Sequence, residues 1–186
     1  MKKSDLQKLA AAMKNKKLSV DQVIELNSSV KIESQKVIDA TGDIELTDDY
    51  TKTVEQAVAD GNYDWKNPSI TAKNFPISPE MIGKKIKVST KLFHFNRDIS
   101  SEDAISEMDK AGYRPATLME LLVLGFLFPE LQRQFPVVAL GSVWRDANLY
   151  RYVPCLFVSG SERRLGLFRF GGSGWRARCL FLGLRK

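Results

Sequence analysis

The sequence predicts an α+β fold in which two helices flank a mainly antiparallel sheet. An apolar, strand-like run comes first, at residues 86–95. Two helix start signals follow it, at Ser100 and Thr117. After Phe135 the chain becomes a series of short strand-like segments joined by turn residues. Consecutive strands with short connections pair antiparallel, whereas strands that alternate with helices would predict a parallel sheet.

The first 49 residues predict a helical N-terminal extension, ahead of a domain that spans residues 50–186. A second short helix is expected at Val20–Leu26, and a third at Tyr50–Ala59, where Gly61 would stop it. The first helix is predicted by apolar residues at the spacing of one helical face, namely Leu6, Leu9, Ala10 and Met13.

The two helices of the domain carry capping signals. Ser100 precedes Asp103 by three residues, and Gly112 follows the amphipathic stretch, so this helix should begin and end there. Thr117 and Glu120 fit a capping box at the start of the apolar stretch 121–128, which Pro129 interrupts.

Four strands are expected after this point, and the first strand of the domain should pair with the last. Ile86–Phe95 and Arg178–Arg185 are both apolar, and each would be an aggregation-prone edge if it were left unpaired. The four expected strands are Pro136–Trp144, Tyr150–Val158, Arg163–Phe170 and Trp175–Arg185.

The charge is unevenly distributed along the chain. Residues 1–110 hold 16 Lys, 1 Arg and 18 Asp plus Glu, a net charge of −1, whereas residues 111–186 hold 10 Arg, 1 Lys and 4 Asp plus Glu, a net charge of +7. A basic excess can indicate nucleic-acid binding, but phosphate contacts use lysine as readily as arginine. The near absence of lysine makes nucleic acid an unexpected partner, and it stays open only as an alternative.

Neither a membrane span nor a secretion signal is visible in the sequence. No apolar run reaches the ~18 residues that a spanning helix needs, and polar residues follow the basic start of the chain. This leaves open a cytoplasmic location or export by another route. Cys155 and Cys179 are expected to be free thiols in a chain without a secretion signal.

Several sequence words in fixed order resemble the variable proteins of diversity-generating retroelements. These words are GYRPATLMELL, PVVALGSVW, RYVPCL, RRLGLFRF and W…FLGLRK, and the resemblance covers residues 75–186 well and extends weakly to Tyr50. It implies a C-type lectin fold and a noncatalytic ligand-binding protein, with a segment at about 143–182 that an adenine-directed reverse transcriptase rewrites. The implied ligand is unidentified, and we expect a protein or a cell-surface molecule.

The composition of the C-terminal segment agrees with what the resemblance implies. Codons that begin as AAC or AAT and change only at adenine can yield Tyr, Phe, Cys, Ser, Gly, Ala, Arg or Leu, but not Lys, Glu, Gln or Met. From Phe135 to Arg185 the chain has no Lys, no Gln and no Met, and its one Glu is Glu162.

Alternation along the expected strands separates a buried framework from a solvent-facing variable set, because substitutions are tolerable only where side chains face solvent. The framework is Val153, Leu156, Leu165, Leu167, Trp175, Phe181, Leu182 and Leu184. The predicted ligand-facing set is Leu149, Tyr150, Tyr152, Cys155, Phe157, Arg164, Gly166, Phe168, Arg169, Gly171, Ser173, Arg176, Ala177, Arg178 and Cys179. Tyrosine and arginine are the residues most typical of binding hot spots.

The remaining candidates for chemistry carry weaker signals. His94 has no assignable nucleophile and is interpreted as a core or edge histidine. The acidic cluster Asp43, Glu45, Asp48 and Asp49 lacks the spacing and glycine of an EF-hand and is expected to be a solvated loop. We therefore expect no catalytic residues, metal or cofactor. An enzyme of the formylglycine-generating type, which shares the lectin-type fold and uses paired cysteines, is the alternative.

Overall fold

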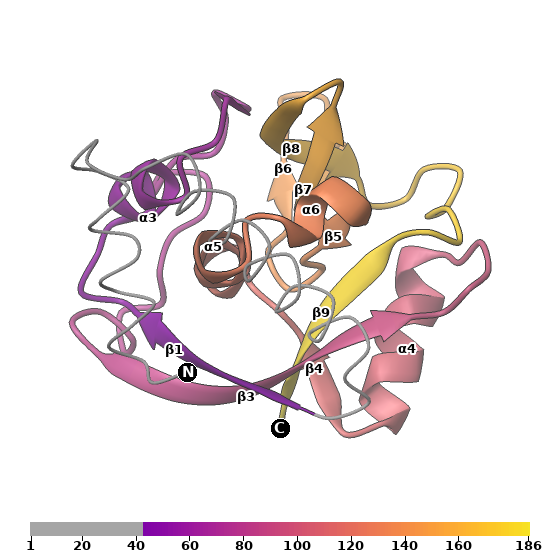
Figure 1. Cartoon of the computed structure of the whole chain (residues 1–186), viewed down its shortest axis with the longest axis horizontal. Helices are drawn as coiled ribbons and strands as arrows, with labels where there is room; N and C mark the ends of the chain where they lie inside the picture. Colours follow the sequence, from indigo (N-terminus) through magenta and orange to yellow (C-terminus); the bar gives the residue numbers. More distant parts are fainter. Residues whose placement is uncertain (1–42) are drawn as a thin grey trace, which may run out of the picture.

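The computed structural model describes residues 43–186, so the two helices expected before residue 43 lie outside the described residues. The described chain is mixed α and β, with one large sheet in the order β1-β3-β9-β5-β7-β8-β2; β4 also pairs with β9, and β6 with β7 (Figure 1). The strands are β1 (Ile44–Asp49), β2 (Trp65–Lys66), β3 (Lys85–His94), β4 (Tyr113–Pro115), β5 (Val137–Val138), β6 (Trp144–Arg145), β7 (Arg151–Ser159), β8 (Glu162–Arg169) and β9 (Leu180–Arg185). The helices are α3 (Val54–Asp60), α4 (Ser101–Lys110), α5 (Leu118–Leu127) and α6 (Leu131–Gln134).

The predicted pairing of the first apolar strand with the last is confirmed. β3 and β9 pair antiparallel, with Thr90 opposite Leu184 and His94 opposite Leu180. β9 also pairs with β5 and β4, so it lies inside the sheet and has no open edge along most of its length. In Figure 1, β9 crosses the middle of the molecule and ends at the C-terminus beside β3.

The two predicted capping signals begin the two main helices. The Ser100 hydroxyl accepts a hydrogen bond from the Asp103 N–H at the start of α4. At the start of α5, Glu120 accepts from the Thr117 N–H at 2.6 Å and completes the capping box. Pro129 follows the end of α5, as expected, and α3 ends at Gly61.

Two hydrophobic cores lie on opposite faces of the sheet. One contains the α5 side chains together with alternate residues of β9, namely Leu180, Leu182 and Leu184. The other contains Ala104 and Met108 of α4 together with Phe181, the intervening β9 residue. A strand that is buried on both faces must be apolar at successive positions, which explains the continuous run Leu180–Leu184.

A buried arginine and a buried glutamine fix the β7–β8 hairpin to the helices. The Arg163 guanidinium donates to the carbonyl oxygens of Gly125 and Pro129, both at 3.1 Å, and to Oε1 of Gln132 at 3.2 Å. The Gln132 amide in turn donates to the carbonyl oxygen of Phe157 at 2.8 Å. Hydrogen bonds that satisfy buried polar groups define one arrangement of the hairpin on α5 and α6.

Three sequence predictions need correction. The acidic cluster is no solvated loop, because β1 pairs with β3 along residues 44–49 and Asp48 is fully buried. The sheet therefore includes residues that the sequence assigned to the N-terminal extension. The strand expected at Pro136–Trp144 is reduced to the two-residue strands β5 and β6, and the last strand begins at Leu180 and not at Trp175.

No helix within residues 43–186 is long and apolar enough to cross a membrane.

Candidate functional site

The register of the β7–β8 hairpin divides its side chains between two faces. Cross-strand partners share a face, so Cys155 and Gly166 lie with Phe157 and Phe168, on the side of the α4 core. Tyr152 and Arg169 pair on the opposite side, where Leu156 and Leu165 enter the α5 core. The predicted ligand-facing residues of the hairpin are therefore divided between the two faces of the sheet.

The larger group surrounds a groove that we call the basic groove. It lies between the β7–β8 hairpin, α6 and the segment 171–179, and its cavity volume is about 320 Å³. Seven predicted residues line it: Cys155, Phe157, Phe168, Ser173, Arg176, Arg178 and Cys179. Trp175 and Arg133 complete its aromatic and basic lining.

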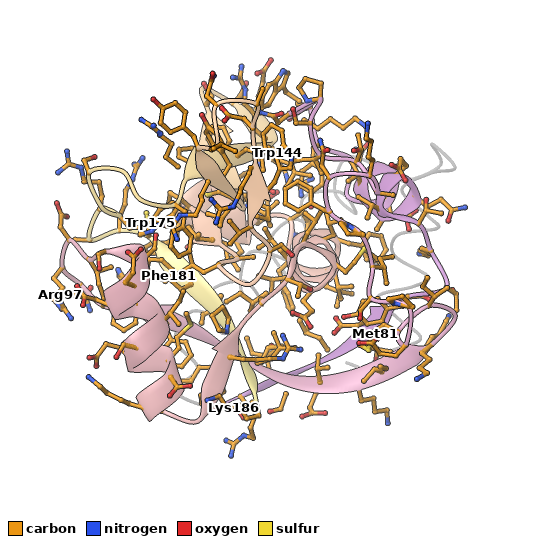
Figure 2. All side chains as sticks on the ribbon, turned by 180° about the vertical axis from the view of Figure 1, so that it is seen from behind. Met81, Arg97, Trp144, Trp175, Phe181 and Lys186 are labelled. Carbon is orange, nitrogen blue, oxygen red and sulfur yellow. The ribbon has the colours of Figure 1, made fainter. Side chains whose placement is uncertain are left out.

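The segment 171–179 is held in place by the residues just before α4 and by the first turn of that helix. Trp175 and Ile99 exchange two backbone hydrogen bonds, of 2.8 and 3.0 Å. The Trp175 indole N–H donates to the Ser101 hydroxyl at 2.9 Å, and this hydroxyl donates to the carbonyl oxygen of Phe170. Figure 2 shows Trp175 beside Phe181, next to α4. Because the buried Trp175 anchors the segment 171–179, the residues on either side of it can face the groove while the segment stays in place.

The arginines of the basic groove differ in their partners. Arg176 forms an ion pair with Asp98 at 2.9 Å, and Arg133 forms one with Glu130 at 3.2 Å. Arg178 is exposed and has no ion-pair partner among residues 43–186. The groove thus presents an uncompensated guanidinium in a lining that also holds aromatic side chains, a combination that accepts carboxylates and planar groups.

Three of the predicted ligand-facing residues are buried, which contradicts the prediction for them. Cys155 and Cys179 lie at the base of the groove, and both are free thiols. Burial raises the pKa of the Cys155 thiol strongly and that of the Cys179 thiol to a lesser extent. Both therefore stay protonated, the opposite of what a reactive thiolate requires.

Gly166 is buried because an aromatic ring covers it. A Cβ built at Gly166 would lie 2.7 Å from Cε1 of Phe157, which is too close for an ordinary contact. The Phe157 and Phe168 rings meet edge to face there, with centroids 5.1 Å apart. The side chain allowed at position 166 therefore depends on the residue at position 157.

The second group, which we call the tyrosine patch, consists of Leu149, Tyr150, Tyr152 and Arg169. The Arg169 guanidinium lies 3.7 Å from the centroid of the Tyr150 ring, and the tilted rings of Tyr152 and Trp144 have centroids 5.7 Å apart. Asp146 shapes the turn, because its carboxylate accepts hydrogen bonds from the N–H groups of Asn148 and Tyr150, both at 2.9 Å. In Figure 2, Trp144 is well separated from Trp175, one of the aromatic residues of the basic groove.

The other predicted residues lie outside both groups. Arg164 stacks on Trp65 and pairs with Glu162, Gly171 is exposed in the turn after β8, and Ala177 donates its N–H to Asp98 at 2.9 Å. The burial predicted for the framework is confirmed at seven positions, and Leu167 is only partly buried. The exposure predicted for Tyr150, Arg169, Arg176 and Arg178 is also confirmed, while Tyr152 and Phe157 are half-buried.

Sequence reasoning missed the part that α6 plays in the groove. Gln132, Arg133 and Gln134 line it, yet they lie about ten residues before the predicted variable segment. The only signal was that Phe-Pro steps at 128–129 and 135–136 isolate a short element.

His94 and the carboxylates of residues 43–186 give no geometry for a metal site. His94 is exposed at the end of β3, where Nε2 lies 2.9 Å from the carbonyl oxygen of Ala177, so it is an edge histidine, as interpreted. Within residues 43–186, no three His, Cys, Asp or Glu side chains are arranged to hold a metal ion.

The fold and the site together define a mixed α and β protein with an aromatic and arginine-rich surface on one hairpin and its flanking loops. Comparisons with protein-family profiles, with curated proteins and with solved structures give no match.

Proposed function

We propose that this chain is a noncatalytic ligand-binding protein with a C-type lectin fold, whose exposed residues between 149 and 178 are diversified by adenine-directed retroelement mutagenesis. The ligand would be a protein or a cell-surface molecule, held by surface complementarity with aromatic anchors and arginine forks. One observation carries the proposal. Eight residues of the predicted set are exposed, while the framework residues between them are buried, except Leu167, which is partly buried.

The order of the elements supports the fold assignment. From β3 onward, the helices α4, α5 and α6, with the short strand β4 after α4, precede a group of mainly antiparallel strands, and β3 pairs with the last strand, β9. This is the order that the resemblance to retroelement variable proteins leads us to expect.

The backbone at Leu149 supports diversification. Its φ is +63° and its side chain is 72% exposed. Asparagine tolerates this left-handed conformation. In a branched apolar residue the same conformation costs about 1 kcal/mol of conformational energy, and an exposed side chain offsets none of it by burial. A leucine that replaced asparagine by mutation of an adenine-rich codon would account for both the conformation and the residue.

A display library tests the proposal. The eight exposed positions, Leu149, Tyr150, Phe168, Arg169, Gly171, Ser173, Arg176 and Arg178, are randomised on the full chain, and the library is selected against one purified folded protein, lysozyme. We expect most members to fold and some to bind lysozyme with a submicromolar Kd.

A matched library randomises four buried framework positions, Val153, Leu156, Leu165 and Leu182, and should yield almost no folded members. The proposal fails if the first library loses its cooperative thermal transitions as the second does, or if folded members of the first library never yield a binder. A variant with five of the exposed positions changed to Ser should keep its melting temperature, which isolates folding from binding.

A further inference from the structure

We propose that the open edge of β8, residues Gly166–Arg169, binds an extended acidic segment of a partner protein by β-strand addition. This inference rests on the proposed function only in taking the ligand to be a protein. It assigns part of the recognition to backbone hydrogen bonds, which do not depend on the residues that vary.

The edge exists because the neighbouring strand is short. β8 is eight residues long, whereas β2 pairs only with Arg164 and Leu165. Residues 166–169, about 13 Å of strand at 3.3 Å per residue, thus lack a neighbour on that side among residues 43–186.

The hydrogen-bonding pattern shows which backbone groups point outward. The carbonyl oxygen of Arg163 accepts from Asp64 N–H, and that of Leu165 accepts from Asn67 N–H, both at 2.9 Å. Successive residues of a strand direct their backbone groups to opposite sides. The N–H and C=O groups of Leu167 and Arg169 therefore face the same edge, and nothing within residues 43–186 pairs with them.

Both groups of the candidate site meet at this edge. Phe168, 41% exposed, belongs to the basic groove on one face of the hairpin, and Arg169 belongs to the tyrosine patch on the other. An added strand would place alternate side chains against these two groups, because its residues also alternate between the faces. A single ligand strand bound at this edge would thus contact the predicted residues on both faces of the hairpin.

Charge selects the occupant. The Arg169 guanidinium lies on Tyr150 and has no carboxylate partner among residues 43–186. The residue on β8 with a carboxylate, Glu162, is already paired with Arg164 at 2.5 Å. A second copy of β8 would bring another unpaired Arg169 and no free carboxylate to the edge, whereas Asp or Glu in an extended segment would pair with Arg169.

The test uses a displayed library of linear ten-residue peptides with one central Asp or Glu, selected against the full chain. The best peptide is then synthesised in three forms, one unmodified and two with N-methyl groups on alternate amides, one for each alternation frame. Backbone pairing predicts at least a tenfold loss of affinity for the methylated peptide in one of its two alternation frames, measured by calorimetry.

Variants of the chain give the matching result from the protein side. Leu167→Pro removes an outward N–H without breaking a β7–β8 hydrogen bond, and it should weaken binding of the unmodified peptide at least tenfold. Leu167→Val keeps that N–H and should bind as the parent chain does. Arg169→Glu should also lose tenfold or more, whereas Arg97→Glu makes the same charge change at a distant site and should not.

The outcomes separate this inference from the proposed function. If no peptide is enriched, or if binding is insensitive to both N-methylation and Leu167→Pro, the inference is overturned, while lysozyme binders from the randomised library would still support the proposed function. If peptides bind through the edge but the randomised library never yields a binder, the proposed function fails and the inference stands. A parent chain that dimerises in sedimentation, with dimerisation abolished by Leu167→Pro, would overturn the inference because the edge would be occupied by a second copy.

Discussion

β9 and β8 belong to the same sheet and differ little in length, yet they are built on opposite plans. β9 pairs with β3, β4 and β5, and its residues from Leu180 to Leu184 are all buried between the two cores. β8 buries Leu165 but leaves Phe168 and Arg169 exposed, and its outer edge is open beyond the two residues that β2 covers. The difference separates a strand that stabilises the domain from one whose end is available for contacts.

The comparison predicts its largest effect at the C-terminus. Deletion of the last four residues, 183–186, removes the buried Leu184 and the ion pair between Arg185 and Asp43 at 2.7 Å, together with ladder pairs to β3 and β4. We expect the whole domain to lose its cooperative thermal transition, well beyond terminal fraying. Circular dichroism melts would show this, and a truncated chain with an unchanged melt would contradict the role assigned to β9.

Removal of Lys186 alone is the matched control for that deletion. This residue is exposed and forms a surface ion pair with Asp109. Exposed ion pairs contribute about 0–1 kcal/mol, so the melt should barely change.

Within β8, substitutions should divide according to burial. Leu165→Ala creates a cavity in the α5 core and should lower the free energy of unfolding by about 2–5 kcal/mol. Arg169→Ala removes an exposed side chain and its contact with Tyr150, and should cost less than about 1 kcal/mol. Urea denaturation of the two variants measures both values, and equal costs would show that the end of β8 is part of the core.

A third prediction concerns the buried carboxyl group of Asp48 on β1. Asp48 is fully buried on β1, and neither of its side-chain oxygens has a hydrogen-bond partner. Burial, assisted by the negative charge of Glu120, raises its pKa to about 7. The folded state thus keeps a proton that the unfolded state releases above the ordinary aspartate pKa of 3.8. The stabilising contribution is therefore complete below that pH and is lost as pH rises toward 7.

Asp48→Asn should abolish this part of the pH dependence. At pH 8 the variant should be more stable than the parent chain by about 2–4 kcal/mol, and near pH 4 the two should be alike. Denaturation at a series of pH values tests this. The neighbouring Asp49 is the control, because Thr51 and Lys85 lower its pKa and Asp49→Asn should therefore not stabilise the chain at pH 8.

The last prediction concerns the energetic coupling between Gly166 and Phe157 in the candidate site. Gly166→Val places a side chain against Phe157 and should cost about 1–3 kcal/mol by overpacking. Phe157→Ala should remove most of this cost, so that the double variant is more stable than the sum of the single changes predicts. Additive costs in the double-mutant cycle would mean that the Phe157 ring is not what closes position 166.

An element could be predicted from the sequence when the contacts that fix it join residues close together in the chain. The starts of α4 and α5 were predicted because a capping side chain and its backbone partner are three residues apart, within one helical turn. β1 was missed because half of its residues are acidic, and only pairing with β3, some forty residues away, makes them a strand. The same long-range pairing buries Asp48, which composition alone would place in solvent.

The sequence by itself determined the α+β class, both helix starts, the buried framework and the excess of arginine and aromatic residues after position 135. Each of these follows from local capping, from alternation or from composition, all of which are encoded within a few residues. Only the tertiary structure decided that the predicted ligand-facing residues split between two faces, that α6 completes the basic groove, and that Gly166 lies beneath Phe157. Those results depend on strand register and on close packing between segments that are far apart in the sequence. Local sequence patterns do not show which side chain will fill a given space between such segments.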